Sequence, residues 1–380
     1  MRIAQVAPLA ESVPPKLYGG TERVVSWLTE ELVRQGHEVT LFASGDSETS
    51  AKLVQSVPEG LRLGGIRDHT ASLLVMLDAV RRHAREFDII HFHIDLLQFP
   101  LFRESREKCL TTLHGRLDLA DFHPVYSAFT SMPLVSISAS QRGPLPLANW
   151  LATIQHGLPP GSAPVDTKAR GYLAFLGRIA PEKRPDRAIE IARKAGLPLK
   201  IAAKVDAADK EYFEHVIRPQ LDHPLIEFIG EIDDQQKRQF LGDALALLFP
   251  IDWPEPFGLV MIEAMREGTP VVAWRRGSVA EVIDDGVTGF AVESIDEAVH
   301  ALGLALALDR KSIRTRFEER FTVSRMAANY LMAYERLLNG VDLGSTIGSS
   351  RHSSIKNMAD PIDCLRVAEP AEALLSSPDL

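Results

Sequence analysis

Residues 244–274 read ALALLFPIDWPEPFGLVMIEAMREGTPVVAW, in which two apolar runs flank a segment of strong helix formers. Pro256 suits the first position of a helix, where its missing N–H costs nothing, and Gly268 is typical of a helix end. The stretch therefore predicts a strand, a helix over about 256–267 and a second strand. This is the repeating unit of an α/β fold with parallel strands.

Two glutamates, Glu255 and Glu263, lie eight residues apart in this unit. We expect Glu255 at the start of the helix, beside unpaired backbone N–H groups, and Glu263 about two turns further in. Since that end of a helix attracts anions, a carboxylate there suggests a second task, such as binding a polyhydroxylated ligand. The alternative is a helix cap together with a solvated glutamate.

The whole chain has the composition of a globular protein with two domains. Its 380 residues are 45% hydrophobic and 24% charged, which suffices for two separate cores. The net charge of −9 argues against nucleic acid as the main partner, and the distant Cys109 and Cys364 suggest neither a disulfide framework nor a metal cluster. The N-terminal residues are typical of a first strand, so we expect no signal peptide, and the sequence has no apolar run of about 18 residues that could span a membrane. We therefore expect a cytoplasmic protein, for which peripheral membrane contact stays open.

Short apolar runs alternate with helical patterns in two successive series, which predicts two parallel sheets. The first series has strands near 2–7, 38–43, 88–93, 111–114 and 134–138, with helices near 21–35 and 70–86. The second has strands near 172–177, 199–204, 226–230, 244–250 and 269–274, with a helix that Pro181 opens. We predict an α/β protein with two Rossmann-like domains that face each other across a cleft.

Two features of the sequence suit a phosphate group. Gly19 and Gly20 precede the first helix, where glycines let backbone N–H groups approach an anion; a plain turn is the alternative. Arg178 and Lys183, in FLGRIAPEKRPD at 175–186, are expected just past a strand and in the first turns of the next helix. Cations there oppose the helix dipole, so a bound diphosphate would explain them better than solvated surface charges. The GxGxxG pattern is absent, so a nicotinamide cofactor is not supported.

Three histidines stand at or in predicted strands of the first series. His114 ends a strand in TLHG at 112–115, at the sheet edge where open α/β folds bind ligands. It could donate to a sugar hydroxyl or a phosphate, or be purely structural. His91 and His93 share one face of a strand; a metal could bind there, but no carboxylates complete a site, and we favour structural roles. GxSxG, Walker and HExxH motifs are absent, which indicates chemistry by positioning and charge stabilisation.

In combination, these residues resemble the family 4 nucleotide-sugar glycosyltransferases of GT-B fold, over about residues 1–340. The matching pieces are the GGTE loop at 19–22, HG at 114–115, GRIAPEK at 177–183, EPFGLVMIE at 255–263 and GSVAEVIDDGVTGF at 277–290. The resemblance implies a hexosyltransferase that moves a sugar from a nucleoside diphosphate to a hydroxyl of a glycan, lipid or small molecule. It implies retention of anomeric configuration, no divalent metal and no cofactor.

The family's motifs also imply roles for individual residues. Glu255 would contact hydroxyls of the donor sugar, the backbone N–H groups of 257–259 would face sugar and phosphate, and Glu263 would bind the ribose. Arg178 and Lys183 would neutralise the leaving diphosphate. The catalytic residues implied are His114, Arg178, Lys183 and Glu255. The donor-binding residues implied are Gly19, Gly20, Gly230, Glu231, Phe257, Gly258, Leu259 and Glu263.

The implied domains are an N-terminal acceptor domain over 1–160 and a C-terminal donor domain over 161–322. A final helix over 323–340 would cross back to the first domain, and 341–380, rich in Ser, Asp and Pro, would be a disordered tail. The chain departs from the family at the linker, which reads HGLP at 156–159, and at Ala203, where glycine is common.

Two other functions remain as rivals. A nucleotide-sugar 2-epimerase shares the fold, but we identify no catalytic carboxylates for it in the N-terminal half. A two-lobed ligand-binding protein would need no Arg and Lys pair for a diphosphate and would more often carry an export signal.

Overall fold

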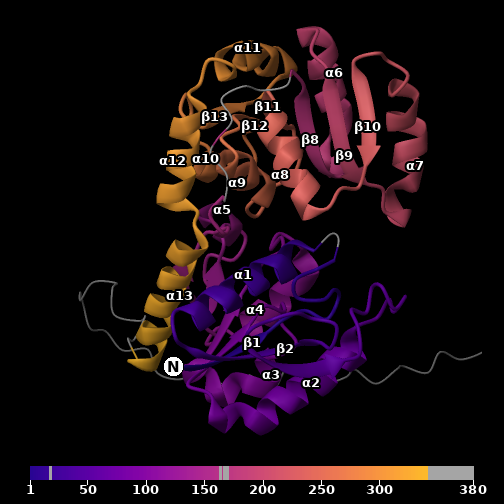
Figure 1. Ribbon diagram of the computed structural model, residues 1–380. Coiled ribbons are helices and arrows are strands. Elements are labelled where there is room, and N and C mark those ends of the chain that lie inside the picture. The colour runs from indigo at the N-terminus through magenta and orange to yellow at the C-terminus, as the bar shows by residue number, and fades with distance from the viewer. Residues whose placement is uncertain (17–18, 162–164, 166–170, 341–380) are drawn as a thin grey trace, which may run out of the picture. The chain divides into compact units, whose positions relative to one another are not determined.

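The computed structural model describes residues 1–16, 19–161, 165 and 171–340, and these form two parallel β-sheets (Figure 1). The first sheet has the strand order β3-β2-β1-β4-β5-β6-β7 and the second has the order β10-β9-β8-β11-β12-β13. In each sheet the order reverses beside the first strand, at β1/β4 and at β8/β11, which is where such sheets bind ligands. The predicted α/β fold with two parallel sheets is confirmed.

The first sheet and its helices come from the first half of the chain. Its strands are β1 (Arg2–Val6), β2 (Glu38–Ser44), β3 (Lys52–Val57), β4 (Ile89–Phe92), β5 (Cys109–Thr112), β6 (Leu134–Ser136) and β7 (Trp150–Thr153). Its α-helices are α1 (Gly20–Arg34), α2 (Thr70–His83), α3 (Phe99–Phe102), α4 (His123–Ala128) and α5 (Ala139–Arg142). Single 3₁₀ segments at Ala84–Glu86, Arg103–Lys108 and Ala120–Phe122 connect them.

The second sheet follows residue 171. Its strands are β8 (Leu173–Arg178), β9 (Leu199–Lys204), β10 (Ile226–Gly230), β11 (Ala246–Phe249), β12 (Val271–Trp274) and β13 (Gly289–Val292). Its α-helices are α6 (Pro185–Ala195), α7 (Lys210–Tyr212), α8 (Asp234–Asp243), α9 (Leu259–Arg266), α10 (Val279–Val282), α11 (Ile295–Ala305) and α12 (Arg310–Arg320). The 3₁₀ segments are Pro181–Lys183, Ala207–Asp209 and Arg218–Gln220, and Phe213–Ile217 is a π-helix.

Side chains of β1 alternate between the two faces of the first sheet, as strand geometry requires. Ile3 lies in a core with Leu28 of α1, whereas Ala4 and Val6 lie in a core with residues of α2 such as Leu77. Gln5 lies between Ala4 and Val6 in the strand, so its side chain is on the same face of the sheet as Ile3, where it is fully buried. A polar residue in this position must find hydrogen-bond partners inside the protein.

The last described helix, α13 (Val323–Leu338), packs against the first sheet although it follows the second in sequence (Figure 1). Its apolar stripe, which includes Met326, Ala327 and Tyr330, shares one core with α1 and β1. Thr322 caps its N-terminus by accepting from the N–H of Arg325. The predicted domain limit at 160/161 stays a prediction, and the predicted tail at 341–380 lies outside the described residues.

Three local predictions are wrong. The helix that carries Glu263 begins at Leu259, because Gly258 adopts a left-handed conformation with φ of 80° and forms the N-cap, so Pro256 and Glu255 precede it in a loop. Pro181 opens a 3₁₀ segment only; Arg184, with φ of 53°, separates Lys183 from α6. β5 ends at Thr112, so His114 lies beyond the strand.

We expect Leu28→Ala to lower the free energy of unfolding by about 2–5 kcal/mol, as buried leucine truncations typically do. Leu28 is 0% exposed in the core that α1, α13 and the first sheet share. Urea unfolding followed by circular dichroism measures the change. Leu338→Ala, at a side chain that is 44% exposed, is the control; equal losses in both would contradict this description of the core.

Candidate functional site

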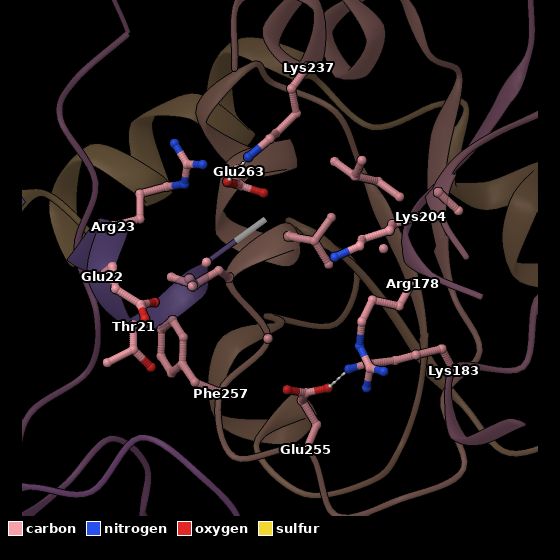
Figure 2. Close-up of a pocket in the computed structure, with 18 of the residues that line it drawn as sticks. Thr21, Glu22, Arg23, Arg178, Lys183, Lys204, Lys237, Glu255, Phe257 and Glu263 are labelled. Carbon is pink, nitrogen blue, oxygen red and sulfur yellow. Dashed lines mark hydrogen bonds and ion pairs between the residues drawn. The ribbon is translucent and has the colours of Figure 1, made fainter. Parts of the chain in front are cut away.

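A pocket of about 510 Å³ lies at the carboxyl ends of the strands of both sheets (Figure 2). The first-sheet side contributes the N-terminus of α1 and the loop after β5, and the second-sheet side contributes the ends of β8 and β9 and the loop before α9. All of the predicted site residues except Gly230 line it: Gly19, Gly20, His114, Arg178, Lys183, Glu231, Glu255, Phe257, Gly258, Leu259 and Glu263. The structure therefore brings together residues that are up to 244 positions apart, from Gly19 to Glu263.

Glu255 is held in place by two donors that share one of its oxygens. Lys183 Nζ lies 2.5 Å and Trp253 Nε1 lies 3.0 Å from Glu255 Oε2. The same Lys183 ammonium sits 4.6 Å from the centre of the Trp253 ring, a cation–π contact. Among the described residues no donor reaches Glu255 Oε1, which leaves this oxygen for a ligand hydroxyl. Sequence reasoning did not identify Trp253 as a site residue, although its position two residues before Glu255 could have suggested a contact with that carboxylate.

Arg178 is surrounded by carboxylates. Its guanidinium lies 3.0 Å from Glu182, 3.5 Å from Asp206 and 3.4 Å from Asp209. Burial tends to raise the pKa of Asp206, but Lys204 and Arg178 outweigh it and lower that pKa. An incoming diphosphate would thus compete with carboxylates for Arg178. Sequence reasoning missed Asp206 and Asp209, since only the fold brings the loop after β9 to the end of β8.

Glu263 is a buried carboxylate among cations. Lys237 Nζ of α8 lies 2.9 Å from its Oε1, and Figure 2 shows Arg23 approaching from α1. Burial alone would raise the pKa of Glu263, but Lys237, Arg266 and Arg23 together lower it. Arg23 also pairs with Asp234 at the start of α8. Helix α1 of the first sheet and α8 of the second thus meet at this carboxylate.

The two glycines at the start of α1, the N-cap Gly19 and the first helical residue Gly20, differ in what their surroundings would tolerate. A Cβ on Gly19 would come within 2.7 Å of Pro15 Cβ, so that position is restricted by packing. A Cβ on Gly20 would meet only Leu259 Cδ1 at 3.5 Å, an ordinary contact. Any need for glycine at position 20 must therefore come from a ligand rather than from the fold.

His114 lies where this pocket meets a second one of about 420 Å³, and it lines both. Its ring stacks on His156 with centroids 5.3 Å apart, and His156 packs against Phe257. Burial lowers the pKa of His114 to about 3, so the ring is neutral near pH 7.

His91 and His93 are buried and hydrogen-bonded inside the first sheet, in line with the structural roles expected for them. In the described ranges no three His, Cys, Asp or Glu side chains are grouped to hold a metal.

Family models match the two halves of the chain. Residues 18–150 match the model for Glycosyltransferase Family 4, and residues 165–322 match the model for glycosyl transferases group 1. The phosphatidyl-myo-inositol mannosyltransferase of Mycobacterium leprae is 25% identical over 372 residues, which cover 88% of this chain and 96% of that protein.

Solved structures of similar fold cover nearly all of the described chain. AviGT4, a glycosyltransferase involved in avilamycin A biosynthesis, has a TM-score of 0.66 at 24% identity over 90% of this chain and 98% of its own. HepE of Anabaena, crystallised with UDP-glucose, has a TM-score of 0.66 at 17% identity over 88% and 99%. At these identities the structures show the fold, which is GT-B.

We expect Lys237→Met to raise the folded-state pKa of Glu263, because burial then acts against fewer cations. In the wild type this pKa is lowered, so the carboxylate stabilises the fold above its unfolded pKa of about 4.3. That stability is lost as the pH falls through the folded pKa. The variant's free energy of unfolding should therefore fall relative to wild type as the pH rises from about 4 to 7.

Urea unfolding at several pH values measures this effect. Lys194→Met, which removes an exposed pair with Asp296, is the matched control and should show no such trend. A Lys237→Met protein whose stability runs parallel to wild type would show that the Glu263 carboxylate does not depend on Lys237.

Proposed function

Since this chain belongs to the family 4 glycosyltransferases, which are enzymes, we propose that it moves a hexosyl group from a nucleoside diphosphate sugar to a hydroxyl acceptor with retention of configuration. The observation that carries the proposal is the pocket itself. It combines a paired carboxylate with one unoccupied oxygen, Glu255, a second buried carboxylate, Glu263, and the cations Arg178 and Lys183. Sugar hydroxyls suit the carboxylates, and a diphosphate suits the cations.

The donor would lie mainly against the second sheet. Glu263 would accept from the ribose hydroxyls, and Glu231, at the end of β10, would lie beside the base. Glu255 Oε1 would accept from a hydroxyl of the sugar. The UDP-glucose bound by the structural relative HepE supports a nucleotide-sugar donor here.

The reaction breaks the bond between the anomeric carbon and the phosphate oxygen, and the diphosphate leaves with the electron pair. The acceptor oxygen bonds to the anomeric carbon from the same face, and its proton passes to the leaving phosphate. Arg178 and Lys183 stabilise the charge that develops on that phosphate. No protein nucleophile is needed, and the cations act where a metal ion would act in other transferases.

The second pocket is our proposed acceptor site. It shares Pro8, Thr21, His114 and Gly115 with the first pocket, so an acceptor there would meet the donor sugar at His114. Its lining is apolar at residues such as Leu73 but also contains the Asp95 carboxylate, which suits a hydroxyl-bearing glycan, lipid or small molecule. The similarity to a mannosyltransferase named for phosphatidyl-myo-inositol supports a lipid-linked polyol among these.

Membrane contact of this enzyme would be peripheral under this proposal. No helix of the described ranges is long and apolar enough to cross a membrane. A cytoplasmic location stays a prediction from the sequence.

Incubation with UDP-, GDP- and ADP-sugars, with and without candidate acceptors and EDTA, tests this function. We expect nucleoside diphosphate to be released only when an acceptor is present, EDTA to leave this release intact, and the product to keep the anomeric configuration of the donor. A changed sugar with the nucleotide retained would identify the epimerase rival, and binding without turnover would identify the binding-protein rival.

We expect Trp253→Phe to lower turnover about 3- to 10-fold, because Glu255 loses one hydrogen bond while the aromatic ring is kept. The thermal midpoint should change little, since the ring still covers Lys183. Initial rates at saturating donor measure the effect. Trp274→Phe, in β12 and outside the pocket, is the control; equal losses of turnover would point to a general loss of packing.

A further inference from the structure

A chain of hydrogen bonds runs beneath the pocket from His114 to α13, and Gln5 of β1 stands at its centre. Gln5 Oε1 lies 2.7 Å from His93 Nε2, and Gln5 Nε2 lies 3.2 Å from the Tyr334 hydroxyl. His93 Nδ1 in turn lies 2.9 Å from His114 Nε2. Gln5 and Tyr334 are 0% exposed and His93 is 3% exposed, so water cannot replace these partners.

The amide oxygen of Gln5 decides where the protons on the two histidines lie. That oxygen can only accept, so His93 Nε2 must carry a hydrogen. Burial holds the pKa of His93 well below its usual value, so the ring is neutral and its Nδ1 has no hydrogen. A bare Nδ1 can only accept, so His114 Nε2 must donate to it. The single proton of the neutral His114 ring is then on Nε2.

The hydrogen bonds on the other side of Gln5 can run from donor to acceptor without conflict for the same orientation of its amide. Gln5 Nε2 donates to the Tyr334 hydroxyl, which donates to His91 Nδ1 at 2.8 Å. His91 Nε2 donates to Thr112 Oγ1 at 2.7 Å, and Thr112 donates to the Tyr330 hydroxyl at 3.0 Å. Each group from Gln5 to Thr112 donates once along this path, the Tyr330 hydroxyl accepts at its end, and no two donors face each other.

The opposite direction would leave a buried donor unsatisfied. Turning the Gln5 amide would reverse every bond and move the His114 proton to Nδ1. His114 Nδ1 is shielded from solvent and has no hydrogen-bond partner among the described residues. A buried N–H without a partner is costly and rare. The orientation of the Gln5 amide in the structure gives the direction in which His114 Nδ1 is bare, and the hydrogen at the far end of that path belongs to the rotatable Tyr330 hydroxyl rather than to a fixed ring N–H.

We propose that Gln5 is a positioning residue that fixes His114 as the Nε2–H tautomer, so that His114 Nδ1, which is shielded from solvent without a ligand, accepts a hydrogen bond from a hydroxyl of the sugar or acceptor once the bound ligand displaces the groups that cover it. This rests on the proposed function, in that it places a carbohydrate ligand where the two pockets meet at His114. From the sequence, His114 is expected to donate a hydrogen bond to the ligand; in this proposal it accepts one. A hydroxyl can donate to a bare nitrogen, whereas a phosphate oxygen cannot, so His114 would select hydroxyl groups and disfavour phosphate.

Nitrogen NMR of the ¹⁵N-histidine-labelled full chain near pH 7 tests the tautomer, with His114→Gln for assignment. We expect His114 to show a protonated Nε2 and a bare Nδ1 in the wild type. In Gln5→Leu, His93 loses its acceptor, and His114 should become a mixture of tautomers. In Gln5→Glu, whose side-chain oxygens can still accept from His93, the wild-type tautomer should return. Protonated Nδ1 in the wild type, or an unchanged tautomer in Gln5→Leu, would overturn the proposal.

Kinetics separate positioning from packing. We expect Gln5→Leu to lower kcat roughly 10- to 100-fold, as loss of groups that orient a functional side chain does elsewhere, with little change in nucleoside diphosphate affinity, and Gln5→Glu to recover most of it. Tyr334→Phe is the matched control, because it breaks the far branch and leaves the bond between Gln5 and His93 intact. An equal loss of kcat in Tyr334→Phe would show that only packing is at work and would overturn the proposal.

The NMR and kinetic experiments distinguish an incorrect tautomer assignment for His114 from an incorrect proposed function. The wild-type spectrum alone decides the tautomer, so it stands even where Gln5→Leu does not fold. Expected tautomers in a protein that transfers no sugar from any donor would refute the proposed function and, with it, the hydroxyl ligand of His114, while the proton assignment would hold.

Discussion

Parallel strands place their carboxyl ends at one edge of a sheet, and the site of this protein depends on that constraint in both sheets. β8 and β9 carry Arg178 and Lys204 to the edge of the second sheet, and the loop after β5 carries His114 to the edge of the first. No single element holds the pocket. Each sheet supplies groups of different chemistry, with cations and carboxylates mainly from the second sheet and the imidazole and the helix N-terminus from the first.

The charged groups in the pocket neutralise one another in the absence of a ligand. Lys183 pairs with Glu255, Lys237 pairs with Glu263, and Arg178 faces three carboxylates. Pairing makes burial of these charges tolerable, since removal of one partner of a buried pair typically costs about 3–5 kcal/mol. It also means that a diphosphate gains the cations only by exchange with protein carboxylates. Binding should therefore discriminate by geometry, because net attraction alone is largely cancelled.

Much of the fold and the site could be predicted from the sequence, because apolar runs and glycines act locally. The two-sheet α/β fold followed from alternation of strands and helices, and the predicted site residues other than Gly230 line one pocket. Helix starts were misplaced where a left-handed residue, Gly258 or Arg184, broke a pattern that composition alone would continue. The partners of the site residues, Lys237, Asp209 and Trp253, were missed. Two of these come from other elements, and such contacts depend on how distant loops meet rather than on spacing in the sequence.

The histidines of β4 show how a structural element can serve the site. The alternation of a strand predicted that His91 and His93 share a face, and their rings lie with centroids 4.0 Å apart. That face is covered by α13, whose Tyr334 hydroxyl is a hydrogen-bond partner of His91 and whose Tyr330 hydroxyl bonds to Thr112, the other partner of His91. Buried polar groups in this layer need hydrogen-bond partners, so the neighbour of each imidazole determines which of its two nitrogens carries the hydrogen. The same series of donors and acceptors extends to His114 at the pocket. Helix α13, which follows the second sheet in sequence, thereby supplies hydrogen-bond partners to the polar groups of the first sheet that lie next to the site.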